Sequence, residues 1–222
     1  MPAAPRPLVL LGLLASGALA AAAFGGHRVL AQGRPADDAA NVRILLEAMR
    51  GTGPIPCGFA LSVVEGNAGW GRWSGGAGSG RDSVTTALKA WLGEELHDPG
   101  VVPALAAALG PGDACVRQTA ARLLGRVHHA AATRALVTAL RDADATSREL
   151  GAIGLGLAGD PAGYEPLVAA LRDPAAPVRA ASAAALGQLG DHRAAAPLLP
   201  LLARDPAPEV RRAAAAALGA LE

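Results

Sequence analysis

Leucine positions in the second half of the chain recur every 31 residues and define one face of a repeated helix. The first leucine column comprises Leu105, Leu136, Leu167 and Leu198. The second column lies four residues further on and comprises Leu109, Leu140, Leu171 and Leu202. Because residues i and i+4 share one side of an α-helix, the two columns predict a short amphipathic helix in each repeat.

A turn and a second amphipathic pattern follow each of these helices. The turns read GPGDA, RDADA, RDPAA and ARDPAP, and their Asp and Pro residues favour a tight turn that leads into a helix N-terminus. The second pattern has three columns: Val116, Ser147, Val178 and Val210; Leu124, Leu155, Leu186 and Leu218; and Gly125, Gly156, Gly187 and Gly219. The last repeat has one additional turn residue, Ala203. Its later columns therefore follow those of the preceding repeat by 32 residues instead of 31.

Each repeat is therefore a helix, a turn and a second helix, and such a hairpin is too small to bury its own apolar faces. Stacking lets neighbouring hairpins share one continuous core. Small residues in the second helix permit close helix approach, and they are Ala121, Ala152, Ala183 and Ala215. The pattern predicts an all-α solenoid whose hairpins span residues 98–129, 130–160, 161–191 and 192–222.

The runs LVAALRDPAAPVRAASAAALGQLGD and LLARDPAPEVRRAAAAALGAL resemble HEAT repeats of the short variety that is also found in phycobilin-lyase-like proteins. The shared features are a Leu-rich helix, an Asp-Pro turn, Val-Arg, an Ala-rich helix and Leu-Gly. The resemblance implies a right-handed superhelix of stacked hairpins of the armadillo/HEAT kind. It also implies a structural ladder of turn aspartates and helix arginines, comprising Asp142, Arg148, Asp173, Arg179, Asp205 and Arg211.

The ladder has two interpretations. One arginine per repeat, at positions 117, 148, 179 and 211, could form a basic stripe that binds an anionic partner. The matching number of turn acids favours the other interpretation, in which each arginine bonds a neighbouring aspartate and free helix-end carbonyls. In the first repeat Pro111 takes the aspartate column, although Asp113 is close.

The segment before the array is less regular. Residues 32–40 form a polar lead-in, and residues 41–66 have the hairpin pattern without Val-Arg or Leu-Gly, which predicts a degenerate N-terminal repeat. A Gly-rich loop at 67–82 carries Trp70, Arg72 and Trp73, and a further helix is expected at 83–97. Exposed tryptophans are favoured binding anchors, so this loop is a candidate contact site. The alternative is that both tryptophans fold back over the core of the cap.

Residues 1–31 have the pattern of a secretory signal peptide. Arg6 precedes an apolar run from Leu8 to Phe24, and small residues follow. The alternative is an uncleaved anchor, because the run is just long enough to cross a bilayer. We therefore expect an exported protein, periplasmic or secreted, or one held at the membrane by this segment.

Composition and charge narrow the classes of function. With 20 basic and 19 acidic residues the net charge is +1, which gives no electrostatic attraction toward nucleic acid. His128 and His129 fall in an inter-repeat turn and predict no metal site, and no catalytic constellation or cofactor motif is present. Cys57 and Cys115 are expected to be buried free thiols, with a disulfide as the alternative that export permits.

Glycines at positions 151, 154, 156 and 159 fall in a single predicted helix. Each interior glycine costs about 1 kcal/mol relative to alanine. We expect this helix to be a soft point of the array, either a hinge or a place where another backbone approaches closely.

These features favour a bacterial, exported, non-catalytic scaffold that binds another protein or a peptide. The alternatives are a bilin-lyase-like enzyme and, less favoured, a nucleic-acid-binding HEAT protein. Second helices line the inner surface in similar proteins, so the candidate partner-binding residues are Trp70, Arg72, Trp73, Arg117, Gln118, Arg122, Glu149, Arg179, Gln188 and Arg212. Apolar area on the C-terminal repeat also predicts self-association or docking at that end.

Overall fold

The computed structural model describes residues 38–50 and 98–222, and within these ranges every regular element is a helix. Helix α2 (Asp38–Met49) comes first, and four hairpins follow it. The hairpins are η2 (Pro99–Val101) and α5 (Val102–Ala108) with α6 (Ala114–Arg126); α7 (Ala130–Ala139) with α8 (Ala145–Ala158); η3 (Pro161–Gly163) and α9 (Tyr164–Ala170) with α10 (Ala176–Leu189); and η4 (His192–Ala194) and α11 (Ala195–Arg204) with α12 (Pro208–Ala220).

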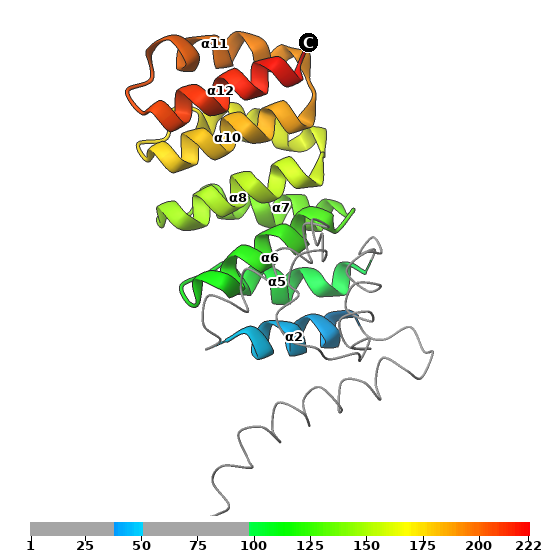
Figure 1. Cartoon of the computed structure of the whole chain (residues 1–222). Helices are drawn as coiled ribbons and strands as arrows, with labels where there is room; N and C mark the ends of the chain where they lie inside the picture. Colours follow the sequence, from blue (N-terminus) through cyan, green and yellow to red (C-terminus); the bar gives the residue numbers. More distant parts are fainter. Residues whose placement is uncertain (1–37, 51–97) are drawn as a thin grey trace, which may run out of the picture.

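The hairpins stack in chain order from α2 at one end to α11 and α12 at the other (Figure 1). The second helices pack side by side along the stack, α6 on α8, α8 on α10 and α10 on α12. Each first helix packs against the second helix of its own hairpin. The predicted all-α class of stacked, HEAT-like hairpins is confirmed.

A single core runs through the stack, and the leucine columns form its centre. Every member of the column Leu105, Leu136, Leu167 and Leu198 is 0% exposed. The leucines at positions 124, 155 and 186 of the second helices are also 0% exposed. Because successive repeats contribute to one core, burying apolar surface in one hairpin depends on the presence of the next.

Aspartates cap the second helices of the first two hairpins, α6 and α8, as the turn composition predicts. The Asp113 carboxylate accepts hydrogen bonds from the backbone N–H groups of Cys115 and Val116 at 2.8 and 3.1 Å, and Asp144 accepts one from Ser147 at 3.0 Å. Such side-chain caps satisfy backbone donors that have no partner inside the helix. At the other end of α8 and α10, Gly159 and Gly190 adopt left-handed φ values of 61° and 68°. These glycines end the helices without the strain that a side chain would bring.

The glycines inside α8 sit where neighbouring helices approach closely. A Cβ atom added at Gly151 would lie 2.6 Å from the backbone nitrogen of Leu140, the C-cap residue of α7. At Gly154 it would lie 3.0 Å from the carbonyl oxygen of Ala121 in α6. The geometry fits the close-approach interpretation of this glycine-rich helix, whereas its expected softness remains a prediction.

The predicted N-terminal elements fall largely outside the described residues. This applies to the signal segment 1–31, the Gly/Trp loop 67–82 and the helix 83–97, and to most of the degenerate repeat 41–66. Helix α2 begins at Asp38, so the end of the predicted polar lead-in 32–40 is helical. Val42 and Leu46 of α2 join the core against the first hairpin. Within the described ranges, no helix is sufficiently long and apolar for a membrane span.

Candidate functional site

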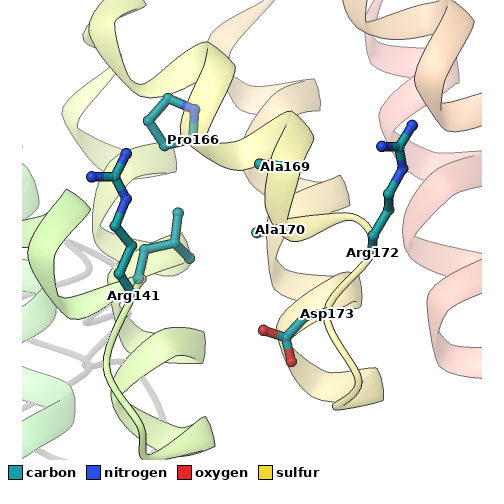
Figure 2. A pocket seen from close by; sticks show the side chains of 7 residues that line it. Arg141, Pro166, Ala169, Ala170, Arg172 and Asp173 are labelled. Carbon is teal, nitrogen blue, oxygen red and sulfur yellow. The ribbon is translucent and has the colours of Figure 1, made fainter.

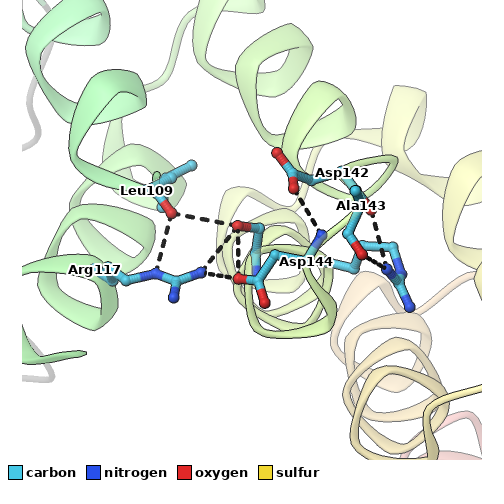
Figure 3. Close-up of polar contacts among 7 residues, drawn as sticks. Leu109, Arg117, Asp142, Ala143 and Asp144 are labelled. Atoms are coloured by element: carbon cyan, nitrogen blue, oxygen red, sulfur yellow. Dashed lines mark hydrogen bonds and ion pairs between the residues drawn. The ribbon is translucent and has the colours of Figure 1, made fainter. Parts of the chain in front are cut away.

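Arginines of the second helices bond the turn of the following hairpin. The Nε and Nη2 atoms of Arg148 in α8 donate hydrogen bonds to the two carboxylate oxygens of Asp173 at 2.7 and 3.0 Å. Its Nη1 donates to the backbone carbonyls of Asp142 and Ala143 at 3.0 and 2.8 Å (Figure 3). One side chain thus closes its own turn and binds the next one, a bidentate geometry that only the planar guanidinium provides.

Arg179 of α10 repeats this arrangement one hairpin later. Its Nε and Nη2 each donate to Asp205 at 2.8 Å, and its Nη1 donates to the carbonyls of Asp173 and Pro174. The two side chains are 13% and 7% exposed. The bonds with Arg179 hold the pKa of Asp205 below its ordinary value, and Asp205 in return raises the pKa of Arg179.

The first rung of the ladder differs from the prediction. Arg117 pairs with Asp144 and not with Asp142, and it also donates to Ser147 Oγ at 2.9 Å and to the Leu109 carbonyl at 3.2 Å (Figure 3). Asp142 instead accepts from the backbone N–H of Asp144. The turn RDADA offers two aspartates, and Asp144 is the one that also caps α8. The bond with Arg117, helped by Ser147, lowers the pKa of Asp144 to about 2.

Two of the candidate partner-binding residues are therefore occupied inside the stack. The side chains of Arg117 and Arg179 are 12% and 13% exposed, and both bond the next turn. The anionic-partner interpretation of the ladder is wrong for these pairs, because their charges are matched by aspartates of the chain itself.

Of the other candidate partner-binding residues in the described ranges, two line a cavity and three do not. A cavity of about 290 Å³ lies across three second helices, and we call it the inner groove. It is lined by Arg122 of α6, Ile153 and Leu157 of α8, and Ala181, Ala184, Ala185 and Gln188 of α10. Two predicted residues, Arg122 and Gln188, are thus brought together from helices two hairpins apart. Gln118 and Glu149 are half-buried and Arg212 is exposed, and none of these three lines the groove.

Two members of the glycine column lie next to residues that line the inner groove. A Cβ atom added at Gly125 would lie 2.7 Å from Cβ of Leu157, and one added at Gly156 would lie 2.9 Å from Cα of Ala185. The helices approach closely at these glycines, and Leu157 beside them is 44% exposed. The lining of the inner groove thus combines apolar side chains with one glutamine and one arginine, a combination common in protein-binding surfaces.

Sequence reasoning missed a second column of arginines. Arg141 and Arg172 lie in the turns directly after the first helices α7 and α9, and both are exposed. They flank α9 around a cavity of about 240 Å³, which Asp173 and Pro166 also line (Figure 2). The signal was available in the turns, where an arginine precedes the aspartate in three of the four repeats.

The remaining chemistry-bearing residues have structural roles. His129 begins α7, where its Nδ1 accepts the backbone N–H of Ala131 at 3.1 Å. Residues 38–50 and 98–222 contain no group of three or more His, Cys, Asp or Glu side chains that could hold a metal ion. Trp70, Arg72 and Trp73 lie outside the described residues.

The expectation of free thiols is wrong for Cys115, which is buried but disulfide-bonded. The only other cysteine of the chain is Cys57, which lies outside the described residues. The expectation of free thiols rested on the separation of about 8–10 Å between packed helices, which is too wide for a disulfide without distortion. It assumed that residues 41–66 form a regular hairpin, and the described part of that segment extends only to position 50.

Comparison with known proteins identifies the repeat. Residues 133–219 match the family model of HEAT repeats, which confirms the resemblance inferred from the Asp-Pro turn, Val-Arg and Leu-Gly features. No curated protein matches the chain. Among solved structures, the complex of CpcE and CpcF of phycocyanin lyase from Nostoc sp. PCC7120 is similar, with 28% sequence identity and a TM-score of 0.47. The match covers 63% of this chain and 59% of that chain.

Proposed function

Because residues 133–219 form HEAT repeats, we propose that the protein is an exported, non-catalytic scaffold that binds another protein through its inner groove. The observation that carries the proposal is the exposed Leu157 in the lining of a cavity that three second helices share. Leu157, which is 44% exposed and lines the cavity together with Ile153, supplies an apolar anchor point, and Gln188 supplies hydrogen-bonding groups in the same lining.

The chemistry of the groove favours a peptide segment of a protein partner. Five of its seven lining residues are alanines, Ile153 and Leu157, so an apolar side chain of the partner gains most by entering it. The amide of Gln188 can both donate and accept, which suits a polypeptide backbone. Arg117, Arg148 and Arg179 of the ladder are matched by aspartates within the stack, so the partner need not be acidic.

Export is supported by two features. The first 31 residues have the order of a signal peptide, with a basic start, an apolar run and small residues. Cys115 is disulfide-bonded, and disulfides persist in oxidising compartments such as the periplasm. We propose a periplasmic or secreted location, with retention at the membrane by an uncleaved N-terminal segment as the alternative.

The test is affinity capture from the envelope fraction with three forms of the tagged full chain. Leu157→Asp places a charge in the inner groove at a position that is already partly exposed. Thr138→Asp places the same charge at an exposed position of α7, outside the residues that line the groove. The proposal predicts a partner that is captured by the wild type and by Thr138→Asp but lost with Leu157→Asp. Identical capture by all three forms would contradict it.

A fourth form tests the Gly/Trp loop separately. The double substitution Trp70→Ala/Trp73→Ala leaves the groove residues in place. If the loop contributes to the same contact, this form loses the partner that Leu157→Asp loses. Retention of that partner assigns the contact to the groove alone.

A further inference from the structure

Two arginines on the first-helix side of the stack take no part in the ladder. Arg141 and Arg172 are exposed, and neither side chain donates a hydrogen bond or forms an ion pair among residues 38–50 and 98–222. Each lies just after the C-terminus of a first helix, where the carbonyl end of the helix favours a cation. This placement accounts for the positive charge but uses none of the N–H donors of a guanidinium. The donors of both arginines are therefore available to a ligand.

The two arginines belong to one cavity. They flank α9 and extend in the same direction, and both line the cavity of about 240 Å³, which we call the outer cavity (Figure 2). Pro166, Ala169 and Ala170 of α9 line it as well, so small apolar groups lie between the two cations. Packed helices lie about 8–10 Å apart, and equivalent positions of consecutive hairpins repeat at about that spacing.

The acids closest to these arginines in sequence are already engaged by other groups. Among the described residues, Asp173 is the one acid that lines the outer cavity, and it accepts two bonds from Arg148. Asp142 does not line it and accepts a bond from the backbone N–H of Asp144. Asp173 and, less strongly, Asp142 raise the pKa of Arg148. The outer cavity thus holds two cations and one acid that a third arginine already neutralises.

We infer that the outer cavity binds an acidic segment of a partner protein, whose two carboxylates accept hydrogen bonds from Arg141 and Arg172. Each guanidinium can hold one carboxylate through two parallel bonds. An extended segment rises about 3.3 Å per residue, so acids about two to four positions apart would span the two cations. A small apolar side chain between these acids would contact Pro166 and Ala169. Because second helices line the inner groove, the outer cavity is a separate contact surface.

A nucleic acid or another uniformly charged polymer fits the outer cavity less well. Each of the two arginines is followed at once by an aspartate, Asp142 or Asp173, so the sign of the charge alternates along this edge of the stack. Glu165 of α9 is exposed and adds further negative charge. A polymer with a charge on every unit would bring some of its charges against these acids, whereas a peptide can place neutral residues there. Charge complementarity therefore favours two separate carboxylates.

The test is a titration of the full-length protein with two synthetic peptides, followed by the NMR resonances of the arginine Nε–H groups. One peptide carries two glutamates separated by alanine and valine, and the other has glutamine in place of both glutamates. We expect the glutamate peptide to shift the resonances of Arg141 and Arg172 with one common dissociation constant, and the glutamine peptide to shift neither. Added salt should weaken the binding, because the contact is an exposed ionic one.

Substitutions then assign the contact to the two arginines. Arg141→Gln and Arg172→Gln should each raise the dissociation constant about fivefold, the upper end for an exposed ion pair. The double substitution should abolish binding. Since neither side chain bonds another group among the described residues, the circular dichroism and the unfolding midpoint should stay unchanged. A loss of binding then reports the contact and not the fold.

Two control variants are matched to this experiment. Arg212→Gln removes the same charge at an exposed position of α12 that lines neither the outer cavity nor the inner groove. It should leave the dissociation constant unchanged. Leu157→Asp alters the inner groove and should leave it unchanged too, so failure of the groove proposal and failure of this inference are distinguishable.

Four results would overturn the inference. They are equal binding of the glutamine peptide, no shift of either resonance at about millimolar glutamate peptide, a response of only one of the two arginines, and equal weakening by Arg212→Gln. A single-stranded oligonucleotide serves as the polymer competitor. If it binds more tightly than the glutamate peptide and depends on the same two arginines, the occupant is a phosphate polymer and the inference is wrong.

Discussion

Arg179 of α10 holds the carboxylate of Asp205 with two parallel hydrogen bonds of 2.8 Å across the boundary between two hairpins. The same guanidinium bonds the carbonyls of its own turn. Each such arginine therefore fixes the turn from which its helix begins and the position of the next hairpin relative to it. The ladder sets the position of each hairpin relative to the next. Burial of the shared leucine core supplies most of the favourable free energy of folding.

Substitution of Arg179 should lower the free energy of unfolding much more than substitution of Arg211. Arg179→Ala leaves the carboxylate of Asp205, 7% exposed, without its partner, and breaking a buried pair in this way costs about 3 kcal/mol. Arg211→Ala removes equivalent bonds to turn carbonyls but no ion pair. Chemical denaturation of the two variants measures the difference in the free energy of unfolding. Equal losses would show that the carboxylate pair contributes nothing beyond the carbonyl bonds.

Acid should weaken the stack through its turn aspartates. Arg117 lowers the pKa of Asp144 from 3.8 to about 2 in the folded protein, and the arginines of the ladder lower the pKa of Asp173 and Asp205 as well. A carboxyl whose folded pKa lies below its unfolded pKa stabilises the fold above the unfolded value, and this stability is lost as the pH falls toward the folded value. We expect a constant free energy of unfolding between about pH 5 and 7 and a decline below about pH 4.

Denaturant titrations across that pH range check this expectation. Asp144→Asn removes one of the titrating groups and should make the decline shallower, while lowering stability at neutral pH. A free energy of unfolding that rises on acidification below pH 4 would contradict the account of the ladder.

Reduction of the disulfide at Cys115 should lower the unfolding temperature. A native disulfide in a small exported domain contributes about 2–5 kcal/mol. Cys115→Ser should have the same effect and should make the midpoint insensitive to dithiothreitol. Peptide mapping without reductant should recover Cys57 linked to Cys115, because the chain has no other cysteine. Modification of both cysteines by a maleimide before reduction would contradict the disulfide.

The period of the sequence was sufficient to predict the stack but not its surfaces. The buried leucines follow from i, i+4 spacing, and the turn aspartates follow from their place before each second helix. The choice of Asp144 over Asp142 by Arg117 could not be predicted, because both aspartates occupy the turn and only the helix start distinguishes them. The inner groove also required the structure, since Arg122 and Gln188 are 66 positions apart and meet only when three helices pack.

Helix α8 should exchange its amide hydrogens faster than α10 if its glycines weaken it. Gly151, Gly154 and Gly156 each lower helix propensity by about 1 kcal/mol relative to alanine. The close approach of α7 and α6 at these positions opposes that effect by adding packing contacts. Hydrogen exchange followed by mass spectrometry separates the two helices. Exchange in α8 no faster than in α10 would show that packing at the glycines outweighs their low propensity.

The stacking of near-identical hairpins is tested most directly by one substitution made at two members of the glycine column. At Gly187 an alanine Cβ would lie 2.7 Å from Cα of Ala217, so Gly187→Ala should destabilise the protein by about 1–3 kcal/mol despite the better helix propensity of alanine. At Gly219 nothing lies within 4 Å, so Gly219→Ala should be neutral or stabilise by up to about 1 kcal/mol. The free energies of unfolding of the two variants, measured in urea, should therefore change in opposite directions. Stabilisation of similar size by both substitutions would show that α10 and α12 do not meet at this column and would contradict the account.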